Sequence, residues 1–187
     1  LLHDTHKGIV YLDPTNLDKT CKESDIVSTT GTKSGCMKWY IYDEEGNNYK
    51  MILDHNTTKG VAWSSLNVGN DTVGWQGSPR LISADEVAKI TNNKSFNSAT
   101  TTYSNWFYLD SNNQTAVASS TNKSKYAWLF DHTRLCASSG CNLSDSNTSG
   151  DGYYTSNLIY GGSFVWGVTR VGKLNFLSKI GDVSKNI

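Results

Sequence analysis

Residues 38–54 constrain the fold of this chain more than any other part of the sequence. Residues 38–42 (Lys-Trp-Tyr-Ile-Tyr) and 49–54 (Tyr-Lys-Met-Ile-Leu-Asp) are runs of aromatic and aliphatic side chains. The residues between them, 43–48, are acidic and end in Gly-Asn-Asn, which favours a tight turn. Two such runs around such a turn predict an antiparallel β-hairpin.

A short helix is predicted after Pro79. Ser83 and Glu86 have the spacing of a capping box, in which each side chain accepts a hydrogen bond from the backbone N–H of the other residue. A modest apolar stripe follows, and Asn92 ends the helix after about two turns. A second candidate helix, 125–130, is too short to be assigned from its periodicity.

The C-terminal third is predicted to form further short strands. They cover 152–156, 163–170 and 174–177, and Gly-containing turns separate them. Within the second of these, apolar side chains alternate, so that Phe164 and Trp166 share a face with Val168. The sequence therefore favours antiparallel strands with few helices.

The composition excludes several classes of protein. The chain has 187 residues, and its 17 basic residues balance its 17 acidic ones. A neutral chain lacks the charge that attracts nucleic acid or an anionic membrane surface. Asn, Ser and Thr make up about a third of it, whereas helical bundles are rich in Ala, Leu, Glu and Lys. Six Trp, ten Tyr and five Phe argue against disorder.

The four cysteines form two local pairs along the chain. Cys21 and Cys36 enclose one polar loop, and Cys136 and Cys141 enclose another. Four cysteines allow three pairings, and four free thiols are the alternative. The local spacing favours two disulfides, Cys21–Cys36 and Cys136–Cys141, and an oxidising compartment. The C-x2-C spacing of a zinc site is absent.

Motifs for catalysis and for metal binding are sparse. The sequence has no nucleophile elbow, P-loop or HExxH motif, so no enzyme is predicted. His55 and His132 each follow an Asp, and hydrogen-bonded structural histidines are favoured over a metal pair. Asp145, Asn147 and Asp151 lie in a loop that matches part of an EF-hand, but the bidentate Glu is missing. We expect no cofactor, with calcium at this loop as the open alternative.

A candidate ligand-binding surface lies near the C-terminus. It combines aromatic, amide and hydroxyl side chains, which are typical of adaptable binding surfaces, and loops often carry function. The alternative is that its Tyr and Phe residues simply pack. The candidate residues are Tyr160, Ser163, Thr169, Lys173, Asn175, Phe176 and Lys179.

Longer strings of residues carry a family resemblance. They are 36–42, 51–58, 79–91 and 125–131, and weaker matches reach from residue 7 to residue 175. These strings resemble a family of secreted, often prepilin-like surface proteins of low-GC Gram-positive bacteria. The same pattern includes Cys136-x4-Cys141-Asn142, Tyr153-Tyr154-Thr155-Ser156, Val165-Trp166 and Arg170-x-Gly172. The whole resembles the C-type-lectin-like domains of bacterial adhesins related to formylglycine-generating enzyme.

The resemblance implies an α+β fold with twisted antiparallel sheets, one or two short helices and long loops. It suggests a C-type-lectin-like domain over 37–187, preceded by a disulfide-tied extension over 1–36. It maps the most varied surface onto 157–179, which adds Asn157 to the candidate site. It further implies an extracellular location, at the cell surface or in a pilus.

Three functions are considered. The first is a non-enzymatic adhesion domain that binds a glycan or protein on a host or neighbouring cell. The second is a pilin-like subunit that assembles into an extracellular fibre. The third, an enzyme of the formylglycine-generating type, is disfavoured because that resemblance implies reactive cysteines after a Gly-Gly-Ser segment, and none follows 161–163. We expect neither a nucleic-acid partner nor direct membrane insertion.

Overall fold

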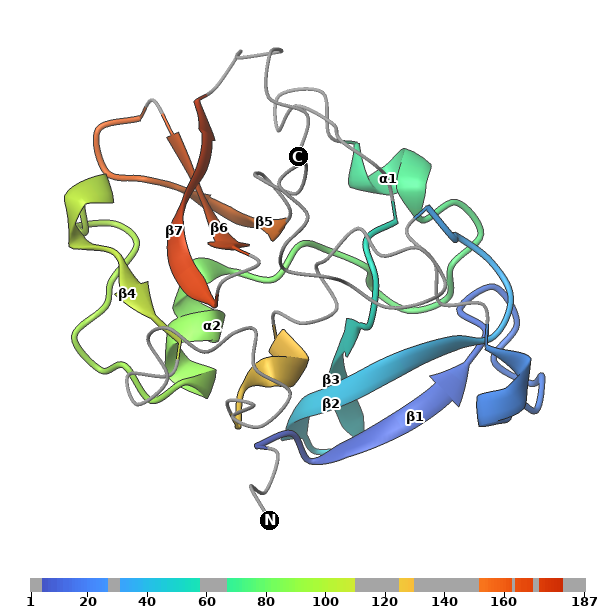
Figure 1. Ribbon diagram of the computed structural model, residues 1–187. Helices are drawn as coiled ribbons and strands as arrows, with labels where there is room; N and C mark the ends of the chain where they lie inside the picture. Colours follow the sequence, from blue (N-terminus) through green and yellow to red (C-terminus); the bar gives the residue numbers. More distant parts are fainter. Residues whose placement is uncertain are drawn as a thin grey trace, which may run out of the picture.

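The computed structural model describes residues 5–26, 31–57, 67–109, 125–129, 152–162, 164–169 and 172–179. These residues form an α+β fold with two antiparallel sheets and a few short helices (Figure 1). The strands are β1 (Gly8–Leu12), β2 (Met37–Glu45), β3 (Asn48–Leu53), β4 (Phe107–Tyr108), β5 (Gly152–Leu158), β6 (Phe164–Thr169) and β7 (Lys173–Lys179). The helices are η1 (Glu23–Asp25), α1 (Val68–Asp71), α2 (Ala84–Ile90), η3 (Tyr103–Asn105) and η5 (Ala127–Leu129).

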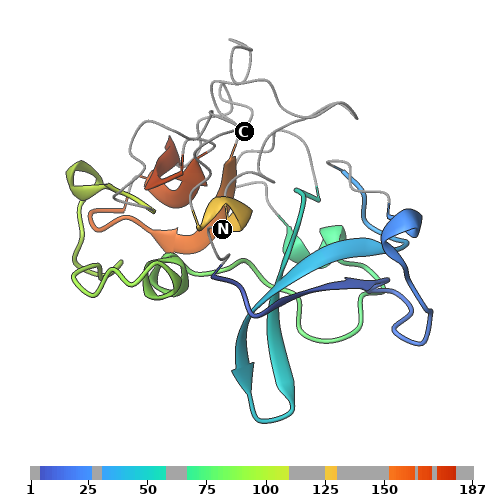
Figure 2. The same ribbon diagram turned by 60° about the horizontal axis from the view of Figure 1, so that its bottom comes forward.

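The first sheet has the order β1-β2-β3, and its β2–β3 hairpin confirms the predicted one. Glu45 pairs with Asn48 across the turn, where Gly46 has a φ of 60°, a backbone conformation that glycine adopts without steric cost. The tip of the hairpin projects from the body of the molecule (Figure 2). The strands therefore run further into the acidic turn than the sequence predicted.

Strand β1 lies within the proposed extension 1–36, yet it pairs with β2 from Gly8↔Ile41 to Leu12↔Met37. The predicted disulfide Cys21–Cys36 is present and ties the following loop to the start of β2. The other predicted disulfide, Cys136–Cys141, lies outside the described residues. The division at residue 36 stays a prediction.

The second sheet has the order β4-β7-β6-β5, and it contains the three C-terminal strands that the sequence predicted. Trp166 and Val168 belong to the core, and Phe164 packs against it, as the alternation indicates. Val165 is also fully buried, and the register of β6 shifts between Val165 and Trp166. Strand β6 is therefore buried on both faces.

Helix α2 begins where the capping box predicts. The Ser83 side chain accepts a hydrogen bond from the Glu86 N–H at 3.0 Å, and the Glu86 carboxylate accepts one from the Ser83 N–H at 2.8 Å. Asn92 follows the helix with a φ of 60°, in the left-handed region. The other candidate helix is the short 3-10 turn η5 within 125–129.

The second sheet, α2 and η5 lie around one centre (Figure 1). The core fills this space, and Tyr40 of the first sheet belongs to it. Burial of the apolar side chains of this core is the main force that holds the two sheets together. The buried members are Tyr40, Ile82, Ala84, Val87, Leu109, Tyr126, Trp128, Leu129, Ile159, Trp166, Val168 and Leu174.

Candidate functional site

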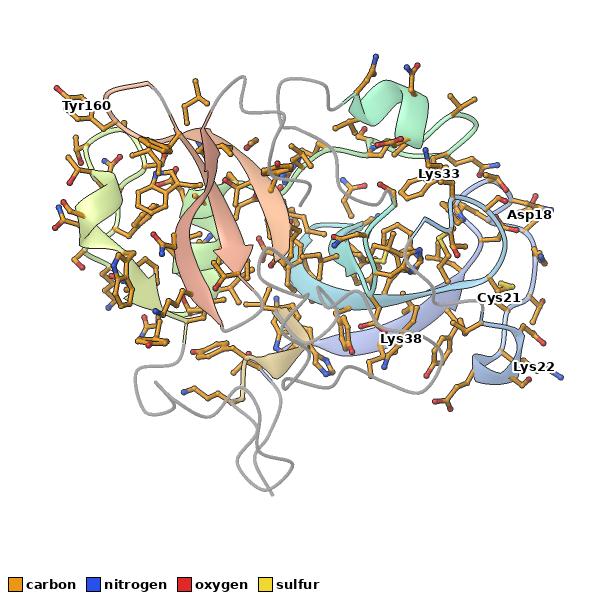
Figure 3. All side chains as sticks on the ribbon, turned by 45° about the horizontal axis from the view of Figure 1, so that its top comes forward. Asp18, Cys21, Lys22, Lys33, Lys38 and Tyr160 are labelled. Atoms are coloured by element: carbon orange, nitrogen blue, oxygen red, sulfur yellow. A yellow bond between two sulfur atoms is a disulfide. The ribbon has the colours of Figure 1, made fainter. Side chains whose placement is uncertain are left out.

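Most of the predicted C-terminal residues lie on the second sheet, but at different ends of it. Tyr160 is 63% exposed in the turn between β5 and β6 (Figure 3). Thr169 and Lys173 flank the next turn, where the Thr169 hydroxyl accepts a hydrogen bond from the Lys173 N–H at 3.1 Å. Six residues of β6 separate the two turns, which is about 20 Å along an extended strand. These residues therefore do not form one cluster.

The Asn157 side chain has a structural partner. Its Oδ1 accepts a hydrogen bond of 2.7 Å from the Ala84 N–H in the first turn of α2, where backbone donors lack partners within the helix. Asn175 is partly buried in β7. Ser163 and the side chains of Phe176 and Lys179 lie outside the described part of the chain. The binding role of the whole set stays a prediction.

Lys173 forms the most organised group on this sheet. Its ammonium lies 4.1 Å from the centre of the Trp106 ring and 4.8 Å from that of Tyr108. The two rings meet edge to face at 5.5 Å, and Trp106 is 40% exposed. Strand β4 holds this pair beside β7 through the pairing Tyr108↔Lys173. Sequence reasoning chose Lys173 but missed its two aromatic neighbours, because nothing local links 106–108 to 173.

A cleft of about 690 Å³ opens between the two sheets, and sequence analysis did not predict it. Its volume lies in the usual range for binding pockets. Strands β2 and β3 form one wall, and α1, residues 75–82 and the start of β5 form the others. Trp39 and Trp75 meet edge to face at 5.5 Å in the wall, and the Trp75 indole N–H donates to the Lys33 carbonyl at 2.8 Å.

The charged side chains that line the cleft are paired. Lys50 lies 2.6 Å from Glu45, and Lys33 lies 2.6 Å from the lining residue Asp71. The guanidinium of Arg80 donates to both carboxylate oxygens of Glu86, at 2.6 and 2.7 Å. The cleft therefore presents little uncompensated charge.

His55 also lines the cleft and confirms the prediction of a hydrogen-bonded structural histidine. Its Nε2 lies 3.0 Å from the Thr32 carbonyl, which can only accept, so Nε2 carries the hydrogen. Burial lowers the pKa of His55, although the Thr32 carbonyl and Asp54 act in the opposite direction. Burial therefore favours the neutral imidazole, and its Nδ1 has no hydrogen-bond partner among the described residues.

No candidate metal site is present in the part of the chain that the structure describes. No three His, Cys, Asp or Glu side chains gather there in a way that could hold an ion. The calcium candidates Asp145, Asn147 and Asp151, and also His132, lie outside that part. No helix among the described residues combines the length and apolar character that crossing a membrane needs.

Comparison with protein-family models, with curated proteins and with solved structures finds no match. The C-type-lectin-like resemblance therefore stays a prediction.

Proposed function

We propose that this chain is a non-enzymatic, extracellular C-type-lectin-like domain that binds a glycan or protein on a host or neighbouring cell. The Cys21–Cys36 disulfide supports a location at the cell surface or in a pilus, because such bonds persist in oxidising compartments. The binding face is the C-terminal part of the second sheet.

The observation that carries this proposal is the ammonium of Lys173 above two aromatic rings. No carboxylate of the described residues lies within ion-pair distance of this lysine. The Trp106 ring offers an apolar surface on which a ligand can stack. The ammonium of Lys173 beside it can donate a hydrogen bond to an oxygen atom of the ligand. Aromatic rings next to polar groups are a usual basis of recognition at such surfaces.

A glycan-array screen of the oxidised domain tests the proposal. Trp106→Ala and Lys173→Ala are each expected to weaken the affinity for the ligand that the screen identifies about tenfold. Each variant removes one side chain of the Lys173, Trp106 and Tyr108 group. Lys125→Ala is the matched control, since Lys125 also lies over a ring, that of Tyr126, but in the turn before η5 rather than on the second sheet. Binding that survives both test variants would contradict this site. Repeating the screen with a chelator tests the calcium alternative.

A structural subunit of an extracellular fibre is the second candidate. Strands β1 and β3 are the two edges of the first sheet, and unpaired edges are templates for pairing with another chain. Sedimentation over a range of protein concentrations separates the two functions, because a fibre subunit assembles with concentration and a monomeric binder does not. Assembly that persists in Lys173→Ala would favour the fibre.

A further inference from the structure

The outer edge of β3 has no strand partner among the described residues. In the sheet order β1-β2-β3, this strand has a neighbour on one side only. Outside its pairing with β2, none of its six residues, Asn48–Leu53, exchanges a backbone hydrogen bond with another described residue. An edge of this kind presents a row of N–H and C=O groups at the spacing of an extended chain.

The cleft runs along this edge. All six residues of β3 line it in succession. Side chains of a strand alternate between its two faces, so a cavity under one face would be lined by every second residue. A continuous lining indicates that the cavity reaches the outer edge of β3, where a further strand would pair, while Trp39 and Tyr42 of β2 indicate that it also extends over a face of the first sheet. Strand β1 also has an open edge, but it does not line the cleft.

The facing edge of β5 is occupied at Gly152, which lines the cleft, and at Ser156, which lies beyond the lining residues of this strand. The Asn56 side chain donates to the Gly152 carbonyl at 3.0 Å, and the Ser156 N–H donates to the Ile82 carbonyl at 3.0 Å. The two walls therefore differ. In the β5 wall, these backbone groups have hydrogen-bond partners within the chain. In the β3 wall, the backbone groups that point away from β2 have no backbone partner among the described residues.

The side chains of the cleft fix the chemistry of its occupant. Lys50, Asp71 and Arg80, which line the cleft, each form an ion pair with a side chain of opposite charge. A charged ligand would therefore find no unpaired charge among them to bind. The remaining lining is largely aromatic and aliphatic, including Tyr49 and Trp75. Burying a charge in such a place without a partner costs free energy, so an uncharged occupant is favoured.

We propose that the cleft binds an extended, uncharged peptide segment of a partner protein, which adds to β3 as a further strand of the first sheet. Main-chain hydrogen bonds to β3 give affinity, and alternate apolar side chains of the peptide meet the aromatic walls. A peptide is favoured over an oligosaccharide because its amides repeat at the spacing of the strand edge. This site is separate from the Lys173 group and does not depend on the function proposed for it.

The probe is a set of end-blocked hexapeptides in which threonine alternates with valine, leucine, phenylalanine or tyrosine. Titration into the oxidised domain is followed by hydrogen exchange at single residues. We expect binding at millimolar concentration or below, with slower exchange at alternate amides of β3 and unchanged exchange in β1. The same peptides, N-methylated at alternate residues, lose one row of donors and are expected not to bind.

Two variants form a matched pair. Tyr49→Ala removes a 57% exposed ring beside the cleft and is expected to weaken peptide binding about tenfold. Ile9→Ala changes a 41% exposed side chain on the other edge strand and should leave binding unchanged.

Four results would overturn the proposal. The first is that no peptide of the set binds. The second is that N-methylated peptides bind equally well, and the third is that the protected amides lie outside β3. The fourth is that maltohexaose binds and protects β3 while the peptides do not, which would assign the cleft to a sugar. Loss of glycan-array binding in Lys173→Ala, with peptide binding intact, would leave the proposal standing.

Discussion

The two sheets of this protein are stabilised in different ways. The second sheet is built by burial: Trp166, Val165, Val168 and Leu174 are all fully buried. The first sheet buries Met37, but in the part of the chain that the structure describes no further strand pairs with either of its edges, and a disulfide fixes the start of β2. A sheet that does not depend on complete burial can keep an edge free for a partner, whereas the buried sheet supplies the stability.

The largest predicted effect compares one tryptophan from each sheet. Trp166→Ala is expected to lower the free energy of unfolding by about 3–5 kcal/mol, because it leaves a cavity in close-packed surroundings. Trp39→Ala should cost about 1 kcal/mol less, because Trp39 lines the cleft and loses fewer contacts. Urea denaturation of both variants measures the difference, with Trp166→Phe as the volume control. Equal losses would remove the contrast between the sheets.

The next effect concerns the disulfide. Replacing Cys21 and Cys36 by Ser opens a loop with a sequence separation of 15 residues. The expected loss is about 3 kcal/mol, since the unfolded chain regains conformational freedom. Hydrogen exchange should show lost protection first in β1 and β2, and later in β6. Simultaneous loss in all three strands would show instead that the sheets unfold as one unit.

A smaller effect tests the link between the sheets. Glu86 on α2 accepts hydrogen bonds from Arg80 and, at 3.3 Å, from the Tyr42 hydroxyl on β2. Burial raises the pKa of Glu86, but hydrogen bonds from Arg80 and Ser83 outweigh it and lower the pKa from 4.5 to about 2.

The sign follows from the depressed pKa. The stabilisation from Glu86 is fully present above its unfolded-state pKa and is lost as the pH falls through about 2. Glu86→Gln should therefore remove about 1–2 kcal/mol of the stability change between pH 5 and pH 2, after allowance for solvent screening. Chemical denaturation at several pH values measures this. An unchanged pH profile would mean that the pair contributes nothing to holding the sheets together.

The smallest effect is at His55, which follows β3 and lines the cleft between the two sheets. Burial lowers its pKa, so the unfolded chain binds a proton at a pH where the folded chain does not. Stability therefore falls as the pH drops below the unfolded-state pKa of about 6.5. His55→Gln keeps a donor for the Thr32 carbonyl and should flatten the profile between pH 7 and pH 5. A profile as steep as that of the wild type would assign the slope to other groups.

Sequence patterns were sufficient where the signal was local. The β2–β3 hairpin, the capped start of α2 and the three C-terminal strands β5, β6 and β7 were predicted because neighbouring residues carry the turn, cap and alternation. The Cys21–Cys36 bond was predicted for the same reason. Strand β1 was missed as a partner of β2, since a five-residue strand in a loop-rich segment gives little periodicity.

The candidate sites required contacts between distant residues. Lys173 was chosen for its type, but only the pairing of β4 with β7 brings Trp106 and Tyr108 to it. Asn157 was chosen as a ligand-binding residue, and only the packing of β5 on α2 shows that its Oδ1 accepts a hydrogen bond from the Ala84 N–H.

The sequence by itself determined the hairpin, the helix start and the preference for short strands over helices, because turn chemistry, capping and alternation act within a few residues. Only the tertiary structure decided where the cleft opens and which strand edge stays free. Both depend on how β3, β5 and residues 75–82 pack, and these segments are far apart along the chain. Burial of the core brings them together, and no local pattern encodes the space that is left between them.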